Sequence, residues 1–160
     1  MKAILFIILL SFTWLSTLGQ DITFVTFEYT TAVKMENSIV KVSIHQNLND
    51  SYTLEVISQS LYKNALTPTI DKKILINKDQ FRAIVNAVKR IKQDELLKGV
   101  YTPSLDGASY AISFGVTGSS VSYAVQNLTY QTDGRMLRDF MNAVELILKT
   151  ADLDSDTIFS

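Results

Sequence analysis

The chain has 160 residues, of which 47% are hydrophobic, and its 15 basic and 16 acidic residues give a net charge of −1. Because there is no basic excess to neutralise phosphates, nucleic acid is not an expected partner. The chain has no cysteine and a single histidine, which excludes disulfide bonds, thiolate metal sites and the usual zinc clusters.

The start of the chain has the layout of a secretory signal peptide. Lys2 gives a short positive start, and an apolar run extends from Ala3 to Leu15. Thr17 and Gly19 then occupy the −3 and −1 positions for cleavage before Gln20. The run is shorter than the roughly 20 residues of a membrane-spanning helix, and an uncleaved membrane anchor is the alternative.

Cleavage at this point divides the chain into three parts. Residues 1–19 are predicted to be a signal peptide, residues 20–151 a single α+β domain, and residues 152–160 an acidic tail. Without residues 1–19 the chain keeps 141 residues, 14 basic and 16 acidic, which is enough for one hydrophobic core. We therefore expect a periplasmic or extracellular protein with no stable transmembrane segment after signal cleavage.

The signal sequence, which ends in Gly19-Gln20, resembles those of secreted Bacteroidota proteins. The chain as a whole looks similar to the small secreted and periplasmic proteins of that group. This resemblance implies export and covers only the first twenty residues; no motif of a characterised family is matched.

The first strands are predicted from apolar residues at every second position. Ile22–Tyr29 carries apolar residues on both faces, which indicates a strand that is central in its sheet or covered on both sides. Ser38–His45 and Tyr52–Ile57 are predicted to pair as a hairpin, with Val42 and Leu54 turned inward.

A connection and a helix follow. Pro68 excludes a helix before it, so Ser60–Lys73 is predicted to be a surface connection leading to a short strand at Lys73–Ile76. Asn77 and Gln80 have the spacing of a capping box, which predicts a helix start, and Gly99 is the predicted stop. The apolar face of this helix comprises Phe81, Ile84, Val85, Val88 and Ile91. Its solvent face is predicted to hold Arg82, Lys89, Arg90 and Lys92.

The C-terminal third repeats the order of hairpin and helix. Strands around Ile112 and Tyr123 are predicted to pair across a turn at Gly115–Ser119. Thr132 or Asp133 is the predicted cap of the second helix. The predicted apolar face of that helix comprises Met136, Leu137, Phe140, Met141, Val144, Ile147 and Leu148.

These elements predict an α+β fold: a two-layer sandwich in which two helices pack on one face of an antiparallel sheet, built from two hairpin–helix halves. A parallel sheet is disfavoured because most connections are too short for a crossover. The predicted core comprises Val42, Leu54, Phe81, Val85, Val88, Ile112, Phe114, Val125, Phe140, Val144 and Ile147.

Few residues suggest chemistry. His45 is predicted to face solvent, and no nucleophile motif accompanies it. Glu28, Glu55 and Asp106 lie nearest to apolar strands, but nothing in the sequence ties two of them into a catalytic pair. The acidic tail resembles the opening of a calcium loop but lacks the glycine and the closing glutamate of such a loop, so a solvated tail is preferred. We predict no catalytic, cofactor-binding or metal-binding residues and expect no cofactor.

One predicted surface is less ordinary. The outer face of the second hairpin carries only small side chains and would let another backbone approach closely. We interpret it as a possible binding face, and a plain solvent face or a face covered by the N-terminal segment as the alternatives. The face comprises Ser109, Ala111, Ser113, Ser120, Ser122 and Ala124.

Three hypotheses for the function remain. The leading one is an exported non-enzymatic domain that binds a protein, peptide or envelope component, and small secreted proteinase- and lactamase-inhibitor domains have a similar layout. The alternatives are a small carboxylate-dependent hydrolase or isomerase, and a structural subunit of an envelope assembly with a long uncapped strand edge. The sequence does not fix the oligomeric state.

Export gives the first testable prediction. N-terminal sequencing of the periplasmic or extracellular form should begin at or near Gln20, because signal peptidase would remove the residues before it. Recovery of Met1 on protein extracted from the membrane would contradict cleavage and establish an anchor.

Overall fold

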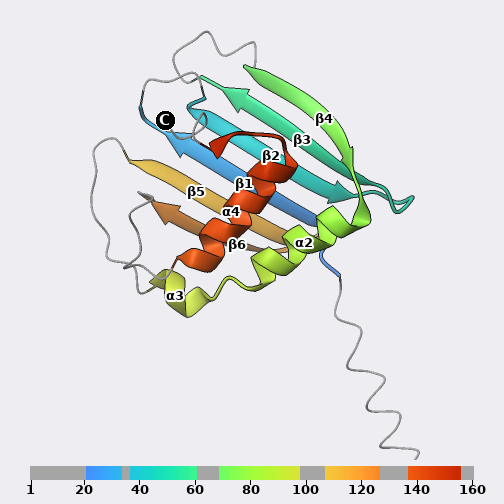
Figure 1. Cartoon of the computed structure of the whole chain (residues 1–160). Helices are drawn as coiled ribbons and strands as arrows, with labels where there is room; N and C mark the ends of the chain where they lie inside the picture. The colour runs from blue at the N-terminus through green and yellow to red at the C-terminus, as the bar shows by residue number, and fades with distance from the viewer. Residues whose placement is uncertain (1–20, 34–36, 61–68, 98–106, 127–136, 156–160) are drawn as a thin grey trace, which may run out of the picture.

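The computed structural model describes residues 21–33, 37–60, 69–97, 107–126 and 137–155. In these segments six antiparallel strands form one open sheet in the order β4-β3-β2-β1-β5-β6, and the longer helices α2 and α4 cross the same face of it (Figure 1). The predicted α+β sandwich with an antiparallel sheet and helices on one face is therefore confirmed.

The element bounds follow the predicted pattern closely. The strands are β1 (Phe24–Thr31), β2 (Ile39–Gln46), β3 (Tyr52–Gln59), β4 (Ile70–Ile76), β5 (Ala108–Val116) and β6 (Ser119–Gln126). The helices are α2 (Lys78–Lys89), the short α3 (Gln93–Leu97) and α4 (Arg138–Thr150).

Strand β1 lies in the middle of the sheet and joins its two parts. It pairs with β2 through Phe27 and Val42, and with β5 through Phe27 and Ile112. Val25 and Phe27 on its helix-facing side have no exposed surface. Of the two predicted alternatives, a central strand is confirmed, because β1 lies between β2 and β5. The side of β1 away from the helices is only partly buried.

The core lies between the sheet and the two long helices. Every second residue of β1, β2, β3 and β5 points into it, which is the period expected of a half-buried sheet. Nine of the eleven predicted core residues are buried, whereas Phe114 and Val125 are half-buried. Phe114 lies on β5 and Val125 on β6, the last two strands at one end of the sheet, where more of each strand is exposed.

Helix α2 begins as the sequence predicts. The side chain of Asn77 accepts a hydrogen bond from the backbone N–H of Gln80, at 2.9 Å, and the side chain of Gln80 accepts one from the N–H of Asn77, also at 2.9 Å. This capping box satisfies two donors that the first turn leaves without a helical partner. The helix ends at Lys89 instead of near Gly99, which lies outside the described residues, and α3 follows it.

Two other predicted boundaries differ from the structure. Strand β4 begins at Ile70, three residues before the predicted strand, because its pairing with Ser58 extends the ladder beyond the apolar residues that marked it in the sequence. Helix α4 begins at Arg138 with Leu137 at its N-cap and no side-chain cap there. The predicted caps Thr132 and Asp133 lie outside the described residues.

The start of the acidic tail is fixed to the domain. Asp152 has a left-handed backbone, with φ of 51°, and the N–H of Leu153 donates to the carbonyl oxygen of Leu148 at 3.0 Å. This arrangement closes the C-terminus of α4 as a Schellman motif. The Nζ atom of Lys72 donates to the carbonyl oxygen of Asp152 at 3.0 Å, so the first residue of the tail is held against the domain.

The burial of α4 yields a stability prediction. Phe140 is 1% exposed, so Phe140→Ala should lower the free energy of unfolding by about 3–5 kcal/mol through lost burial and a cavity. Met141→Ala is the matched control, because Met141 is only half-buried and should cost clearly less. Urea unfolding of the two variants tests this; equal losses would mean that α4 presents a different face to the sheet.

Candidate functional site

The predicted binding face lies on the side of the sheet away from the helices. Tyr110 and Ile112 point into the core, so the residues that alternate with them on β5 point the other way. Register pairs Ala111 with Ala124 and Ser113 with Ser122. The structure thus brings Ser109, Ala111, Ser113, Ser120, Ser122 and Ala124 together on one surface, here called the small-residue face.

A row of hydroxyl groups crosses this side of the sheet. Ser122, Ser113, Thr26 and Ser43 are successive register partners on β6, β5, β1 and β2. Ser113 Oγ donates to Ser122 Oγ at 2.9 Å. Thr26 and Ser43 were not among the predicted site residues. The sequence could have indicated them only through the alternation of their strands, which turns both side chains away from the core.

A glycine shapes the end of the small-residue face. A Cβ atom on Gly115 would lie 2.2 Å from the carbonyl oxygen of Ser119 and 2.8 Å from the Cα of Ser120. Both contacts are with backbone, so a larger residue at this position would force the two strands apart. The turn beyond it contains only Thr117 and Gly118, and Gly118 has φ of 86°, so the hairpin is tighter than the predicted five-residue turn.

The other half of the open face is charged and partly apolar. Lys41 Nζ lies 2.7 Å from Glu28 Oε1, and Lys73 pairs with Glu55. Ile57 and Leu75 are 41% and 79% exposed. Because each of these two carboxylates is paired with a lysine on the neighbouring strand, the two pairs add no net charge to this half of the face.

The two edges of the sheet differ in charge. Strand β4 carries Asp71, Lys72 and Lys73, and edge charges of this kind discourage pairing with another chain. Strand β6 spans Ser119–Gln126 and has neither a charged residue nor a proline. In the part of the chain that the structure describes, no strand pairs with its outer edge.

The residues considered for chemistry are not gathered into a catalytic group. His45 is exposed on the open face, with its ring centroid 6.3 Å from that of Phe24. The pKa of Glu55 is lowered, chiefly by its hydrogen bond to Lys73 and then by the charge of that lysine, whereas a general acid needs a raised pKa. Asp106 lies outside the described residues, among which no three histidine or acidic side chains could hold a metal ion.

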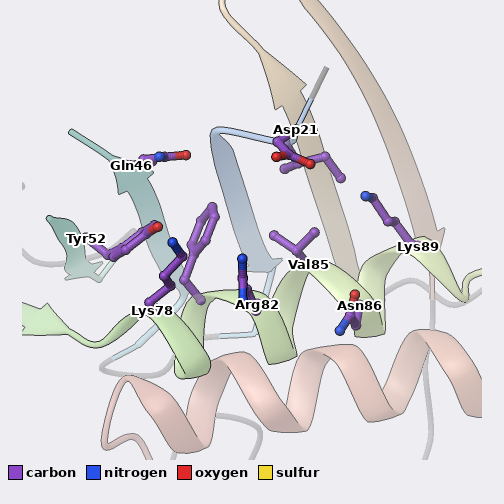
Figure 2. Close-up of a pocket in the computed structure, with 10 residues that line it drawn as sticks. Asp21, Gln46, Tyr52, Lys78, Arg82, Val85, Asn86 and Lys89 are labelled. Atoms are coloured by element: carbon purple, nitrogen blue, oxygen red, sulfur yellow. The ribbon is translucent and has the colours of Figure 1, made fainter. Parts of the chain in front are cut away.

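A cavity that sequence analysis missed lies on the other side of the molecule. It is bounded by helix α2, by the residues just before β1 and by the adjoining ends of β2 and β3, and its volume is about 410 Å³ (Figure 2). Ten of the described residues line it: Asp21, Ile22, Gln46, Tyr52, Lys78, Phe81, Arg82, Val85, Asn86 and Lys89. The spacing of the three basic residues on α2 was the available signal.

Comparisons with known proteins do not place the chain in a family. No protein-family model and no curated protein matches the chain. Among the helices that the structure describes, none is long and apolar enough to cross a membrane. Fold and surface chemistry therefore carry the functional argument.

The Glu55–Lys73 pair gives a prediction about pKa. Lys73→Met should raise the pKa of Glu55 toward its ordinary value, because it removes both a hydrogen bond and a positive charge from the carboxylate. A lowered folded-state pKa means that the pair stabilises the fold above the unfolded pKa and loses this effect as the pH falls through the folded pKa. Both side chains are well exposed, so the effect on stability should be small.

NMR titration of the Glu55 carboxyl carbon measures this shift. Lys149→Met is the control, because Lys149 is an exposed residue of α4 on the other side of the sheet and should leave Glu55 unchanged. If Lys73→Met also leaves the titration of Glu55 unchanged, the pair does not form in solution.

Proposed function

We propose that the protein is an exported, non-enzymatic binding domain whose small-residue face receives a protein or peptide partner. The observation that carries the proposal is the small-residue face, where β5 and β6 present only small side chains on the side of the sheet away from the helices. Residues 1–19, with their signal-peptide layout, support export.

The chemistry of the face favours a flat partner with hydrogen-bonding groups. Alanine and serine side chains allow a partner backbone to approach the sheet closely, and the hydroxyl row offers donors and acceptors at intervals of roughly 4.8 Å, the spacing between strands. The neighbouring Lys41–Glu28 pair is internally neutral, so the face does not select a strongly charged partner. A partner chain would gain affinity from area and hydrogen bonds and little from charge.

The hydrolase alternative receives less support. It requires two carboxyl groups close together, one of them with a raised pKa. Glu28 and Glu55 lie on β1 and β3, separated by β2, and each is paired with a lysine. The lowered pKa of Glu55 is the opposite of what that chemistry needs.

One observation favours the second alternative, a subunit of an assembly. Strand β6 has eight residues, no charge and an outer edge without a strand partner among the described residues. Such an edge is a template for strand addition by another chain. This function would use the edge of β6, whereas the leading proposal uses the adjoining face.

Ala111→Trp tests the leading proposal. Ala111 lies in the middle of the small-residue face, so the indole should block a flat partner while the free energy of unfolding changes by no more than about 0.5 kcal/mol. The measurement combines thermal unfolding with a pull-down from the envelope and culture fluid of the producing cells, followed by mass spectrometry. A protein retained by the unchanged chain should be lost.

Asn142→Trp is the control, because it introduces the same indole at an exposed position of α4 and should keep the partner. Unfolding of Ala111→Trp would show that the face is internal. Retention of the same partner by both variants would place the interaction elsewhere. Light scattering of the protein alone tests whether copies of this chain assemble through β6. A defined oligomer would favour such assembly, and a monomer would overturn it.

A further inference from the structure

The cavity beside α2, described above, has chemistry distinct from that of the small-residue face. Its apolar wall is formed by Ile22, Phe81 and Val85, which are at most 8% exposed. The rings of Tyr52 and Phe81 stack against each other with centroids 4.7 Å apart, which fixes one end of this wall. The wall is therefore part of the folded core and exists before any ligand arrives.

Three cations line the cavity from one side of α2. Lys78, Arg82 and Lys89 are spaced by four and seven residues, which places them within a sector of about 40° along roughly 16 Å of helix. In Figure 2 the side chains of Lys78 and Arg82 rise toward the space below Gln46, and Lys89 extends toward the side where Asp21 lies. The cations thus border the apolar face of the helix instead of lying opposite to it.

These cations have no acidic partner in the described segments of the chain. Lys41 and Lys73 form ion pairs with carboxylates on neighbouring strands, and Lys72 forms one with Asp152 after α4. Lys78, Arg82 and Lys89 form none with the described residues. Among the described residues Asp21 is the single carboxylate that lines the cavity, so the described lining has a net charge of +2 in a chain whose net charge is −1. Asp50 lies nearby, where its Oδ1 accepts a hydrogen bond from Gln46 Nε2 at 3.1 Å.

The capping box occupies two N–H groups at the start of α2, so the proposed recognition is assigned to side chains. The first turn of α2 has its cap N–H and the Gln80 N–H occupied by Gln80 and Asn77. Lys78 and Arg82 lie one turn apart, about 6 Å along the axis, so both could reach the same anionic group. Lys89 is too far along the helix to join them on one head group.

We propose that this cavity binds a small organic anion, with its carboxylate or phosphate between Lys78 and Arg82 and its apolar body against Phe81 and Val85. The volume of about 410 Å³ lies in the range of small-molecule sites and exceeds what an inorganic anion fills. Gln46 and Asn86 add polar groups that would orient the body of the ligand. A head group between a lysine and an arginine would form charge-assisted hydrogen bonds.

The experiment uses phenyl phosphate, phenylacetate, inorganic phosphate and phenol as probes of the purified full chain at low ionic strength. Titrations followed by isothermal calorimetry and by NMR shifts of α2 should show saturable binding of an aromatic anion. The preferred aromatic anion should bind about tenfold or more tightly than inorganic phosphate and than phenol, because the first lacks an apolar body and the second lacks charge. Comparison of phenyl phosphate with phenylacetate identifies the preferred head group.

Arg82→Gln and Lys78→Gln should each weaken that binding by about tenfold or more, since each removes a charge-assisted hydrogen bond. Arg90→Gln is the matched control, because Arg90 follows α2 directly, is exposed and does not line the cavity. Lys78 and Arg82 are both exposed, so the two variants should unfold at the same temperature as the unchanged chain. If one variant misfolds, the other still tests the proposal.

Two results would overturn the proposal. One is the absence of saturable binding of any aromatic anion; the other is an equal loss of affinity in Arg90→Gln, which would indicate general attraction to the surface. Ala111→Trp should leave binding of the aromatic anion unchanged, because the cavity and the small-residue face lie on opposite sides of the sheet. The outcome is therefore independent of the partner-binding proposal.

Discussion

The pairing of β1 with both β2 and β5 is the constraint on which the rest of the structure depends. It joins a meander of neighbouring strands to a hairpin that lies about eighty residues later in the chain, as in the pairing of Phe27 with Ile112. A shift of one residue in this register would turn Val25 and Phe27 from the core to the open face, because strand side chains alternate. Complete burial of both side chains therefore fixes the register and, with it, which residues form the open face.

Placement of both long helices on one side of the sheet gives the molecule two unlike surfaces. The helix side is closed by α2 and α4, which pack against each other as well as on the strands. The other side keeps the hydroxyl row and the cross-strand ion pairs, whose polar groups suit contact with water or with a partner. Both proposed sites follow from this asymmetry, since one uses the side of the sheet away from the helices and the other uses the border of a covering helix.

The border of α2 shows how one helix serves two purposes. Phe81 and Val85 belong to the core but also form the wall of the cavity, so the cavity cannot change shape without disturbing the core. Lys78 and Arg82 are exposed residues of the same helix, and they add positive charge to the solvent-facing part of the cavity lining. A site built in this way is rigid along its apolar wall and adaptable at its charged rim, because long cationic side chains keep their rotamer freedom until a ligand binds.

The sequence alone determined the local features of this protein. Alternation predicts the strands and their inward residues and places the six small residues on one face, and the Asn77–Gln80 spacing predicts the start of α2. The tertiary structure decided what depends on distant neighbours. It set the order of the strands, the half-burial of Phe114, and the addition of Thr26 and Ser43 to the hydroxyl row. Arg82 and Lys89 are exposed, as predicted, and the tertiary structure places them beside a cavity whose opposite wall comes from strand ends that no helical periodicity can specify.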